Sequence, residues 1–312
     1  MKRIKGLLSE EKGQSLVLVA IFMVVLIGFA GLAIDGGRLY IAKSQLQKAV
    51  DAGALAGADI MVDGVNASGV FNHTDSETEA KVMAVKNYNS NMPYEVSFPE
   101  DNIIKVYGKE NVPLLLMPVL GMADTTLVVA EARAEVGRLK RVVKNTIIPI
   151  GIHINDGFEL TFGEVWNLTE SPGDGSKGNF NLLDFSTLPG VTGGENGSQG
   201  VAYYINNGSP VPIEAGTTTV YPQTGDPINS NAIKTAITAL EGQIVYVPIV
   251  SEFSQGSSDP VTITGFAAFR IDDFYKDRSV HTIKATFIKT VLPGEIGTVV
   301  EEYGTYASQL IY

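Results

Sequence analysis

The chain of 312 residues is long enough for about two domains of ordinary size. Its formal net charge is −11, with 34 acidic against 23 basic side chains, which argues against a nucleic-acid partner. Cysteine is absent, which excludes a disulfide framework, a thiolate metal site and a cysteine nucleophile.

The first predicted element is an apolar helix. Residues 1–15 carry several basic side chains, and the run Leu16–Ile34 that follows has no charged residue. At ~1.5 Å per residue this run would cover roughly 28 Å as a helix, close to the thickness of a bilayer's hydrocarbon core. A secretory signal has a shorter apolar region and an extended cleavage site, whereas the pattern past Asp35 stays helical. Residues 16–34 are therefore predicted to form a retained transmembrane helix, with signal cleavage beside Ala30 or Ala33 as the alternative.

The charges that flank this helix predict its orientation. Basic residues precede it within positions 1–15, and the positive-inside rule keeps such an end in the cytoplasm. Arg38, Lys43 and Lys48 follow the run and weaken the rule. The simplest topology is a single pass through the cytoplasmic membrane with residues 1–15 inside and the bulk of the chain outside the cytoplasm.

A pilin-type leader is the third interpretation of this region. Such leaders are basic, end in glycine and precede a long apolar helix, which would place cleavage between Gly13 and Gln14. The peptidases of that class usually act where a glutamate stands five residues after the glycine, and Leu18 occupies that position. Processing at Gly13 is therefore not favoured.

An amphipathic helix is predicted to continue from Gly37 to Ala58, because apolar residues recur there at helical spacing. Ala49, Gly53 and Gly57 form a small-xxx-small run, which lets another backbone approach closely. This helix-packing run fits a contact with the protein's own domain, or a helix–helix contact with another subunit such as a second copy of the chain.

The motifs "KGQS", "IDGGRLY" and "LQKAVDAGALAGA", with the apolar run after the first, resemble the N-terminal segment of the TadG-like family of Flp (Tad) pilus-assembly proteins. The resemblance covers residues 12–58, and residues 95–137 are more loosely similar to the strand-rich stretch that often follows. Val50 and Gly53 depart from the family's usual alanine-rich run. The matching positions are Gly13, Asp35, Gly37, Arg38, Leu46, Gln47, Asp51, Ala52, Ala54, Leu55 and Ala56.

The resemblance implies a membrane anchor helix and an extracytoplasmic domain that supports the assembly of adhesive pili, with pilus-assembly or pilin proteins as partners. It does not imply catalysis. Many proteins of this family carry a von Willebrand-type domain with an Asp-x-Ser-x-Ser metal motif, and this chain lacks that motif.

Residues 35–140 are predicted to form a pilin-like unit of one helix on a small sheet. Residues 59–80 are polar and predict a loop, and Glu79–Asn89 predicts a short helix. "YEVSFP" and "NIIKVYGK" predict two strands around the turn "PEDN", and "TTLVVAEARAEVG" alternates as a half-buried strand. The apolar stretch from Val112 to Leu120 is too short to span a bilayer and is predicted to be buried or to face the membrane.

The basic run 138–145 predicts a solvated linker, and residues 146–312 predict an all-β, sandwich-like domain in an overall α+β fold. A barrel is the alternative. One helix is inserted at "NSNAIKTAITALEG", capped by Asn229 or Ser230. The predicted strands are Thr146–His153, Phe158–Trp166, Gly200–Ile205, Thr218–Tyr221, Gln243–Val250, Val261–Phe269 and Thr282–Val291.

No catalytic, cofactor-binding or metal-binding residue is predicted. His73, His153 and His281 lie too far apart in sequence for metal-ligand spacing. The acidic residues of the segment 271–277 would suit Ca²⁺ only if the chain folded back on itself, and a solvated turn is the preferred interpretation.

The sequence therefore predicts a membrane-anchored, non-catalytic component of Tad-type pilus assembly or secretion. A minor pilin-like filament subunit processed after Gly13 is the first alternative. A cell-surface hydrolase or carbohydrate-binding module is the alternative from a different class, and no nucleophile–base set supports it.

Overall fold

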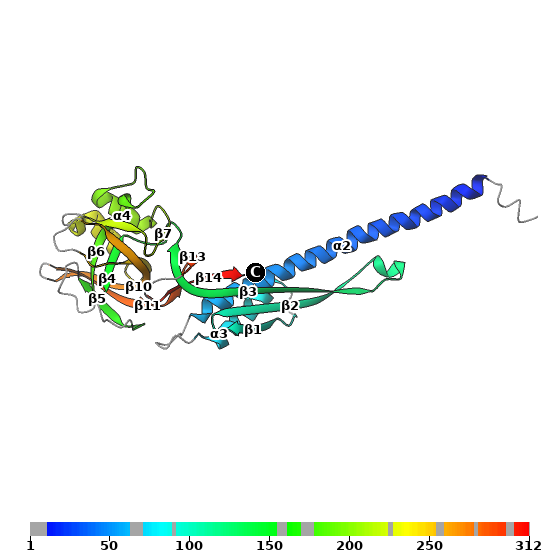
Figure 1. Cartoon of the computed structure of the whole chain (residues 1–312), viewed down its shortest axis with the longest axis horizontal. Coiled ribbons are helices and arrows are strands. Elements are labelled where there is room, and N and C mark those ends of the chain that lie inside the picture. Colours follow the sequence, from blue (N-terminus) through cyan, green and yellow to red (C-terminus); the bar gives the residue numbers. More distant parts are fainter. Residues whose placement is uncertain are drawn as a thin grey trace, which may run out of the picture.

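The computed structural model has three parts (Figure 1). They are a long helix whose first half is free, a helix-covered sheet beside the second half of that helix, and a β-rich C-terminal region. The basic residues at positions 1–10 lie outside the described part of the chain. The described residues are 11–62, 71–88, 92–154, 161–169, 178–223, 227–253, 259–277, 280–297 and 303–311.

Helix α2 runs without a break from Glu11 to Met61, which confirms that the apolar run continues as one helix into the folded part (Figure 1). The side chains from Leu16 to Ile34 are almost all exposed, whereas the second half of α2 buries Leu46, Ala49 and Val50 completely. Among the described helices α2 alone is long and apolar enough to cross a membrane. One element therefore supplies both the apolar segment and a core helix.

Helix α3, His73–Asn87, pairs with the second half of α2 and begins earlier than the predicted loop 59–80 allowed. The reason is a local cap: the side chain of Asn72 accepts a hydrogen bond from the backbone N–H of Asp75. Such a cap replaces the missing intrahelical partner of a first-turn N–H group. The polar composition of the segment concealed this helix start.

The first sheet has the order β1-β2-β3-β14-β12, with β13 and β7 pairing to β3. Strand β3 alternates as predicted, because Val128, Ala130, Ala132 and Ala134 are buried toward the helices. It also extends to Val142, and so into the basic run 138–145 that predicted a linker. The strands are β1 Glu95–Glu100, β2 Ile103–Pro113, β3 Thr125–Val142, β7 Ile213–Glu214, β12 Thr290–Val291, β13 Gly294–Ile296 and β14 Thr305–Ile311.

Strand β14 comes from the end of the described chain and pairs antiparallel with β3, from Tyr306 opposite Arg138 to Ile311 opposite Arg133. The hydroxyl of Ser308 also donates to a carboxylate oxygen of Asp59 on α2, at 2.6 Å. Residues 146–312 are therefore not a unit separate from residues 35–140, because their last strand belongs to the first sheet. Sequence order could not reveal a pairing between segments so far apart.

We expect removal of residues 305–312 to loosen the first sheet although it leaves the strands of the β-rich region intact. The β3 amides that donate to β14 would lose their acceptors, and the opened edge of β3 would let water reach them. Hydrogen exchange should accelerate in β3 between Arg133 and Arg138, while the substitution Ser308→Ala alone changes it little. Unchanged protection of β3 in the truncated chain would contradict this account.

The β-rich region contains a second sheet of order β11-β5-β6-β4-β9-β10-β8. Because β11 pairs with β10 as well as with β5, the strands close into a ring. The expected sandwich is therefore corrected to a barrel-like sheet. The strands are β4 Ile150–Ile154, β5 Val165–Thr169, β6 Gly178–Asp184, β8 Thr219–Pro222, β9 Ile244–Val250, β10 Val261–Asp277 and β11 Val280–Ile288.

Two helices pack on this sheet, so the region is not all-β. Helix α5, Asn231–Thr238, confirms the predicted inserted helix, and Ser230 is its N-cap residue. The predicted strand Gly200–Ile205 is wrong, because it forms helix α4, Gly197–Asn207. Its buried residues Val201, Tyr204 and Ile205 suit one helix face by their spacing. Single-turn helices complete the fold: η1 Met117–Leu120, η2 Phe185–Thr187 and η3 Pro227–Asn229.

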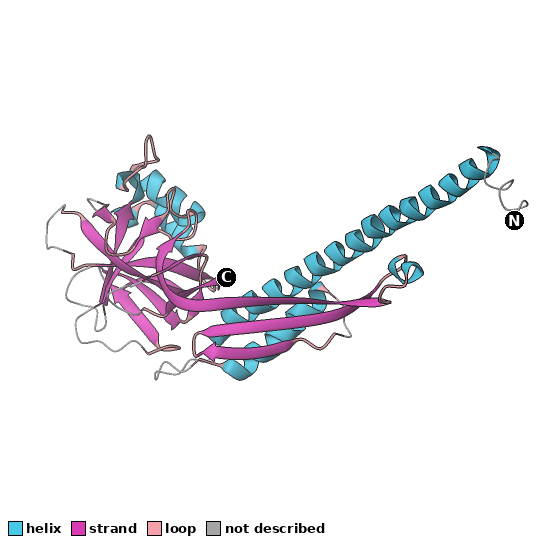
Figure 2. Cartoon of the chain, turned by 45° about the vertical axis from the view of Figure 1, so that its right-hand side comes forward, coloured by secondary structure: helices cyan, strands magenta, loops and turns pink. Residues whose placement is uncertain are grey.

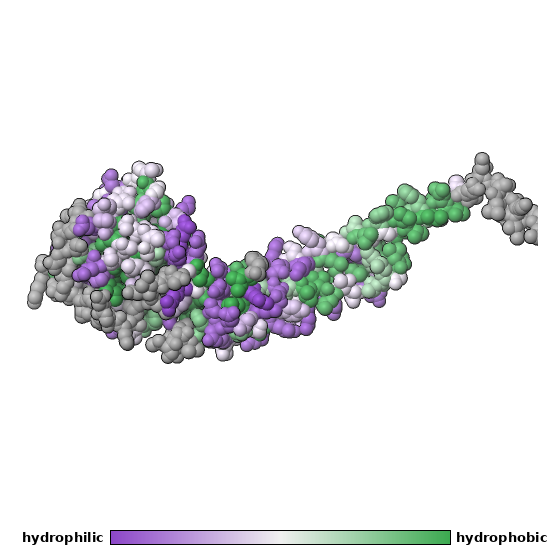
Figure 3. All heavy atoms as spheres, viewed as in Figure 1, coloured by the Kyte–Doolittle hydropathy of each residue, from purple (hydrophilic) through white to green (hydrophobic). Residues whose placement is uncertain are grey.

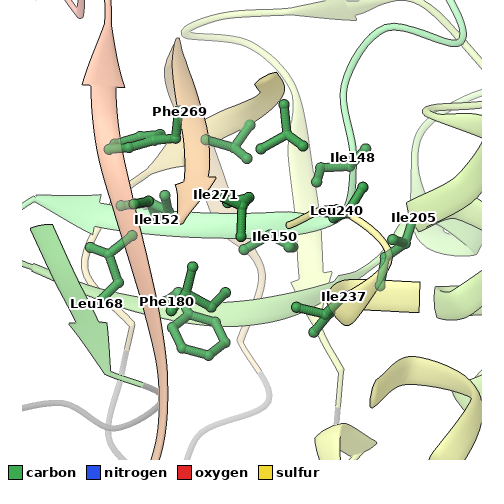
Figure 4. Packing of buried hydrophobic residues seen from close by; sticks show 14 of the residues in the cluster. Ile148, Ile150, Ile152, Leu168, Phe180, Ile205, Ile237, Leu240, Phe269 and Ile271 are labelled. Atoms are coloured by element: carbon green, nitrogen blue, oxygen red, sulfur yellow. The ribbon is translucent and has the colours of Figure 1, made fainter. Parts of the chain in front are cut away.

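The core of the β-rich region lies between the sheet and these two helices, where Ile150, Ile152 and Phe180 meet Ile237 of α5 (Figure 4). Trp166, which is fully buried, makes an edge-to-face contact with Phe269 at a centroid distance of 5.9 Å.

We expect Phe269→Ala to lower the free energy of unfolding by about 3–5 kcal/mol, because it empties a fully packed position. The fluorescence of Trp166, the single tryptophan, reports the transition during urea unfolding. Ile244→Ala on the exposed side of β9 is the matched control and should stay within about 0.5 kcal/mol of the parent. Equal unfolding midpoints for the two variants would refute the assignment of this core.

Candidate functional site

The predicted helix-packing run lies where α2 meets α3. A Cβ atom added to Gly53 would lie 2.8 Å from the carbonyl oxygen of Ala80, and one added to Gly57 would lie 2.9 Å from the Cβ of Ala80. The Ser76 hydroxyl donates to the carbonyl oxygen of Gly57 at 2.7 Å and crosses the same interface. Both glycines and Ala49 are therefore covered by their own chain, and they are closed to a helix from another subunit.

The end of the β2–β3 hairpin lies against α2 at the boundary of the apolar run (Figure 2). We call residues 114–124 the hairpin tip; it contains η1 and is closed by the bond from Leu114 N–H to Asp124 O at 2.9 Å. Gly121 ends η1 with φ 79°, a backbone conformation that glycine adopts without strain.

Asp35 holds the hairpin tip to the helix. Its side chain is 1% exposed, and its two carboxylate oxygens accept three backbone N–H groups, from Leu115 at 2.8 Å and from Leu116 and Met117 at 2.9 Å. Hydrogen bonds to a charged acceptor are the stronger kind. The acidic residue that follows the apolar run thus acts as a clamp between α2 and a segment some eighty positions later in the chain.

Gly31 lies one helical turn before Asp35 and faces the same tip. A Cβ atom there would be 3.1 Å from the Cβ of Leu116, so the absence of a side chain allows close approach. Figure 3 shows apolar residues over the free part of α2 and over the neighbouring end of the hairpin. Sequence reasoning found the apolar stretch from Val112 to Leu120 but gave no sign that Asp35 binds it.

A second group of polar contacts joins the end of α3 to β2 and to the segment before β1. Tyr88 donates its hydroxyl to Glu110 Oε2 at 2.7 Å, and Tyr94 donates to the carbonyl oxygen of Tyr88 at 2.7 Å. Burial, followed by the nearby Glu110 carboxylate, raises the pKa of each tyrosine to about 12. Both hydroxyls therefore remain protonated donors at neutral pH. That of Tyr88 ties the end of α3 to β2, and that of Tyr94 ties the segment before β1 to the end of α3.

The candidate cleavage positions Gly13 and Gln14 belong to the first turns of α2, where the backbone is helical.

The three histidines remain apart in the structure. His73 stacks on Phe98, His153 lies 3.3 Å from the carbonyl oxygen of Val250, and His281 is buried beside Phe274. Among the described residues no group of three or more His, Cys, Asp or Glu side chains is placed to hold a metal ion.

The acidic segment 271–277 is strand β10 rather than a turn. Asp272 accepts hydrogen bonds from Thr286 at 2.6 Å and from Arg270 at 3.0 Å. Burial alone would raise the pKa of Asp272, but these two hydrogen bonds and the Arg270 charge outweigh it and lower the pKa. The carboxylate is thus used within the sheet, in an ion pair with Arg270.

Residues 13–59, which contain the apolar run, Asp35 and the packing glycines, match the family model described as putative Flp pilus-assembly TadE/G-like. The match confirms the resemblance of the N-terminal segment and supports involvement in Flp (Tad) pilus assembly. It covers less than half of the chain, so the β-rich region is not part of it. Neither the curated proteins nor the solved structures give a match.

Proposed function

We propose that the protein is a membrane-anchored, non-catalytic component of Tad-type pilus assembly or secretion, with its sheets outside the cytoplasm as a protein-interaction domain. The observation that carries the proposal is the continuity of α2, whose exposed apolar run passes without a break into the helix that builds the first core. The TadE/G-like match over the same helix supports the pilus-assembly context.

The proposed mechanism is geometric. A continuous helix transmits its position in the bilayer to the domain, and the Asp35 clamp together with the α2–α3 contact prevents the sheet from swinging about the helix end. The orientation with residues 1–15 in the cytoplasm follows from the basic side chains there. Pilus-assembly or pilin proteins would then meet the domain at a set distance from the membrane.

A contact with a second copy of the chain would use a different surface from the glycine run. Gly53 and Gly57 already contact α3, while almost all residues along Leu16–Ile34 are exposed. We therefore place any homo-oligomeric helix contact in the apolar run. In a bilayer such a contact would depend on close packing of small residues such as Gly28.

The test is the intact mass and N-terminal sequence of protein extracted from membranes, combined with protease treatment of intact spheroplasts. A chain that starts at or near Met1, and whose bulk is digested from outside, supports the anchored scaffold. A start at Gln14 would instead favour the minor pilin-like subunit. A start past Ala33 would mean a secreted protein and would remove the anchor from the proposal.

A further inference from the structure

The hairpin tip exposes several large apolar side chains to solvent, which is energetically unfavourable in water. Between Asn111 and Asp124 the sequence has no charged residue. The exposed fractions of the tip's apolar side chains are 56% for Leu115, 71% for Val119, 41% for Leu120 and 59% for Met122. A contiguous exposed apolar patch of this kind marks an interaction surface.

The position of the tip identifies its partner. The Asp35 clamp and the close contact at Gly31 hold the tip beside the last turn of the apolar run. Gly31 is three residues before Ile34, which corresponds to roughly 5 Å along the helix axis. Tyr40, 76% exposed just past the run, suits the interfacial level at which tyrosines collect. If α2 spans the bilayer, the tip therefore lies at the boundary of its hydrocarbon core.

The backbone of the tip satisfies the condition under which irregular structure can enter a membrane, which is that its polar groups are paired within the protein. In hydrocarbon an unpaired N–H group costs several kcal/mol, so loops enter only when their polar groups are paired within the protein. The N–H groups of residues 114–117 all have acceptors, one in Asp124 and the others in Asp35. Val119, Gly121 and Met122 donate to carbonyls within the tip, and Pro118 has no N–H to satisfy.

We propose that the hairpin tip inserts its apolar side chains into the outer boundary of the lipid bilayer beside α2 and is a second membrane contact of the protein. The proposal rests on the proposed membrane anchoring of α2 and extends it. Two attachments, joined by the Asp35 clamp, would restrict rotation and tilt of the domain on the membrane, which a single helix cannot do.

The test uses the absence of native cysteine, so that each introduced cysteine reports one position. Full-length chains with Val119→Cys, Phe29→Cys or Ile244→Cys are labelled with an environment-sensitive fluorophore and placed in nanodiscs of phosphatidylcholine and phosphatidylglycerol. Both faces of a nanodisc are open to solvent, and no other assembly protein is present. Phe29 on the apolar run is 67% exposed and Ile244 on β9 is 52% exposed, so the three sites are comparable in the protein itself.

We expect the label at position 119 to emit at shorter wavelength than the label at 244, to be quenched several-fold less by iodide, and to be quenched by spin-labelled lipid as the label at 29 is. Iodide quenching at 119 equal to that at 244, with 29 still protected, would overturn the lipid contact and leave the tip free for a protein. Loss of protection at 29 as well would show that the anchor itself is wrong. Met122→Cys repeats the test if Val119→Cys alters the fluorescence of Trp166.

Discussion

Asp35→Asn is expected to release the hairpin tip from α2 while the two sheets stay folded. The asparagine keeps the size of the side chain but offers one acceptor oxygen. Its NH₂ group would face the backbone N–H of Leu115 in one orientation, or those of Leu116 and Met117 in the other. An N–H group that faces another donor cannot form a hydrogen bond, and a buried donor without an acceptor raises the free energy of the bound arrangement. In nanodiscs, hydrogen exchange at residues 115–117 should accelerate about tenfold or more, with little change in β1 or in the β-rich region.

The matched control is Asp51→Asn on the same helix. The carboxylate of Asp51 accepts from the side chain of Gln47 at 2.9 Å, and an asparagine can still accept that bond. Exchange at residues 115–117 should therefore stay at the parent rate in this variant. Parental protection of the tip in Asp35→Asn would show that packing at Gly31, rather than the carboxylate, holds the tip.

The second large effect is expected at the contact of α2 with α3. In Gly53→Val the new Cβ would lie 2.8 Å from the Ala80 carbonyl oxygen and 3.1 Å from the Cβ of Ala84, and a backbone oxygen cannot turn aside as a flexible side chain can. The helices must separate, and overpacking of this kind typically costs about 1–3 kcal/mol. Thermal unfolding in detergent should shift to lower temperature, and amides of α3 should exchange faster.

Gly37→Val is the control for this substitution because a Cβ atom at Gly37 meets nothing within 4 Å. Valine and glycine differ in helix propensity by roughly a few tenths of a kcal/mol, so the intrinsic contribution is small in both variants. The Gly37 variant should unfold at the parental temperature. If both variants unfold alike, the glycine run has no packing role, and its close approach to α3 is incidental.

Local patterns in the sequence were enough for the elements whose signals lie within the element itself. The uncharged run and the helical spacing after it predicted one continuous helix, and α2 is that helix. The alternation of residues 125–134 predicted β3, and the Asn/Ser-capped segment predicted α5. The same N-terminal residues carried the TadE/G-like resemblance, which the family match confirms.

Local patterns failed where a segment's neighbours decide its structure. Gly200–Ile205 is short and apolar enough for a strand, yet it buries Val201, Tyr204 and Ile205 as one face of a helix against the sheet. Closure of the second sheet depends on β11 pairing with two strands at once, which alternation does not encode. The sandwich and the barrel share the same strand pattern, so only the pairing could distinguish them.

The sequence by itself determined that the chain has one apolar helix, a small-residue packing face and a strand-rich remainder. Tertiary structure alone decided which surfaces these residues meet. It placed α3 on Gly53 and Gly57, brought β14 back to β3, and set the Asp35 carboxylate on the tip of a distant hairpin. The physical reason is that spacing along one element records which side chains share a face, whereas the partner of that face comes from packing and hydrogen bonding across the whole chain.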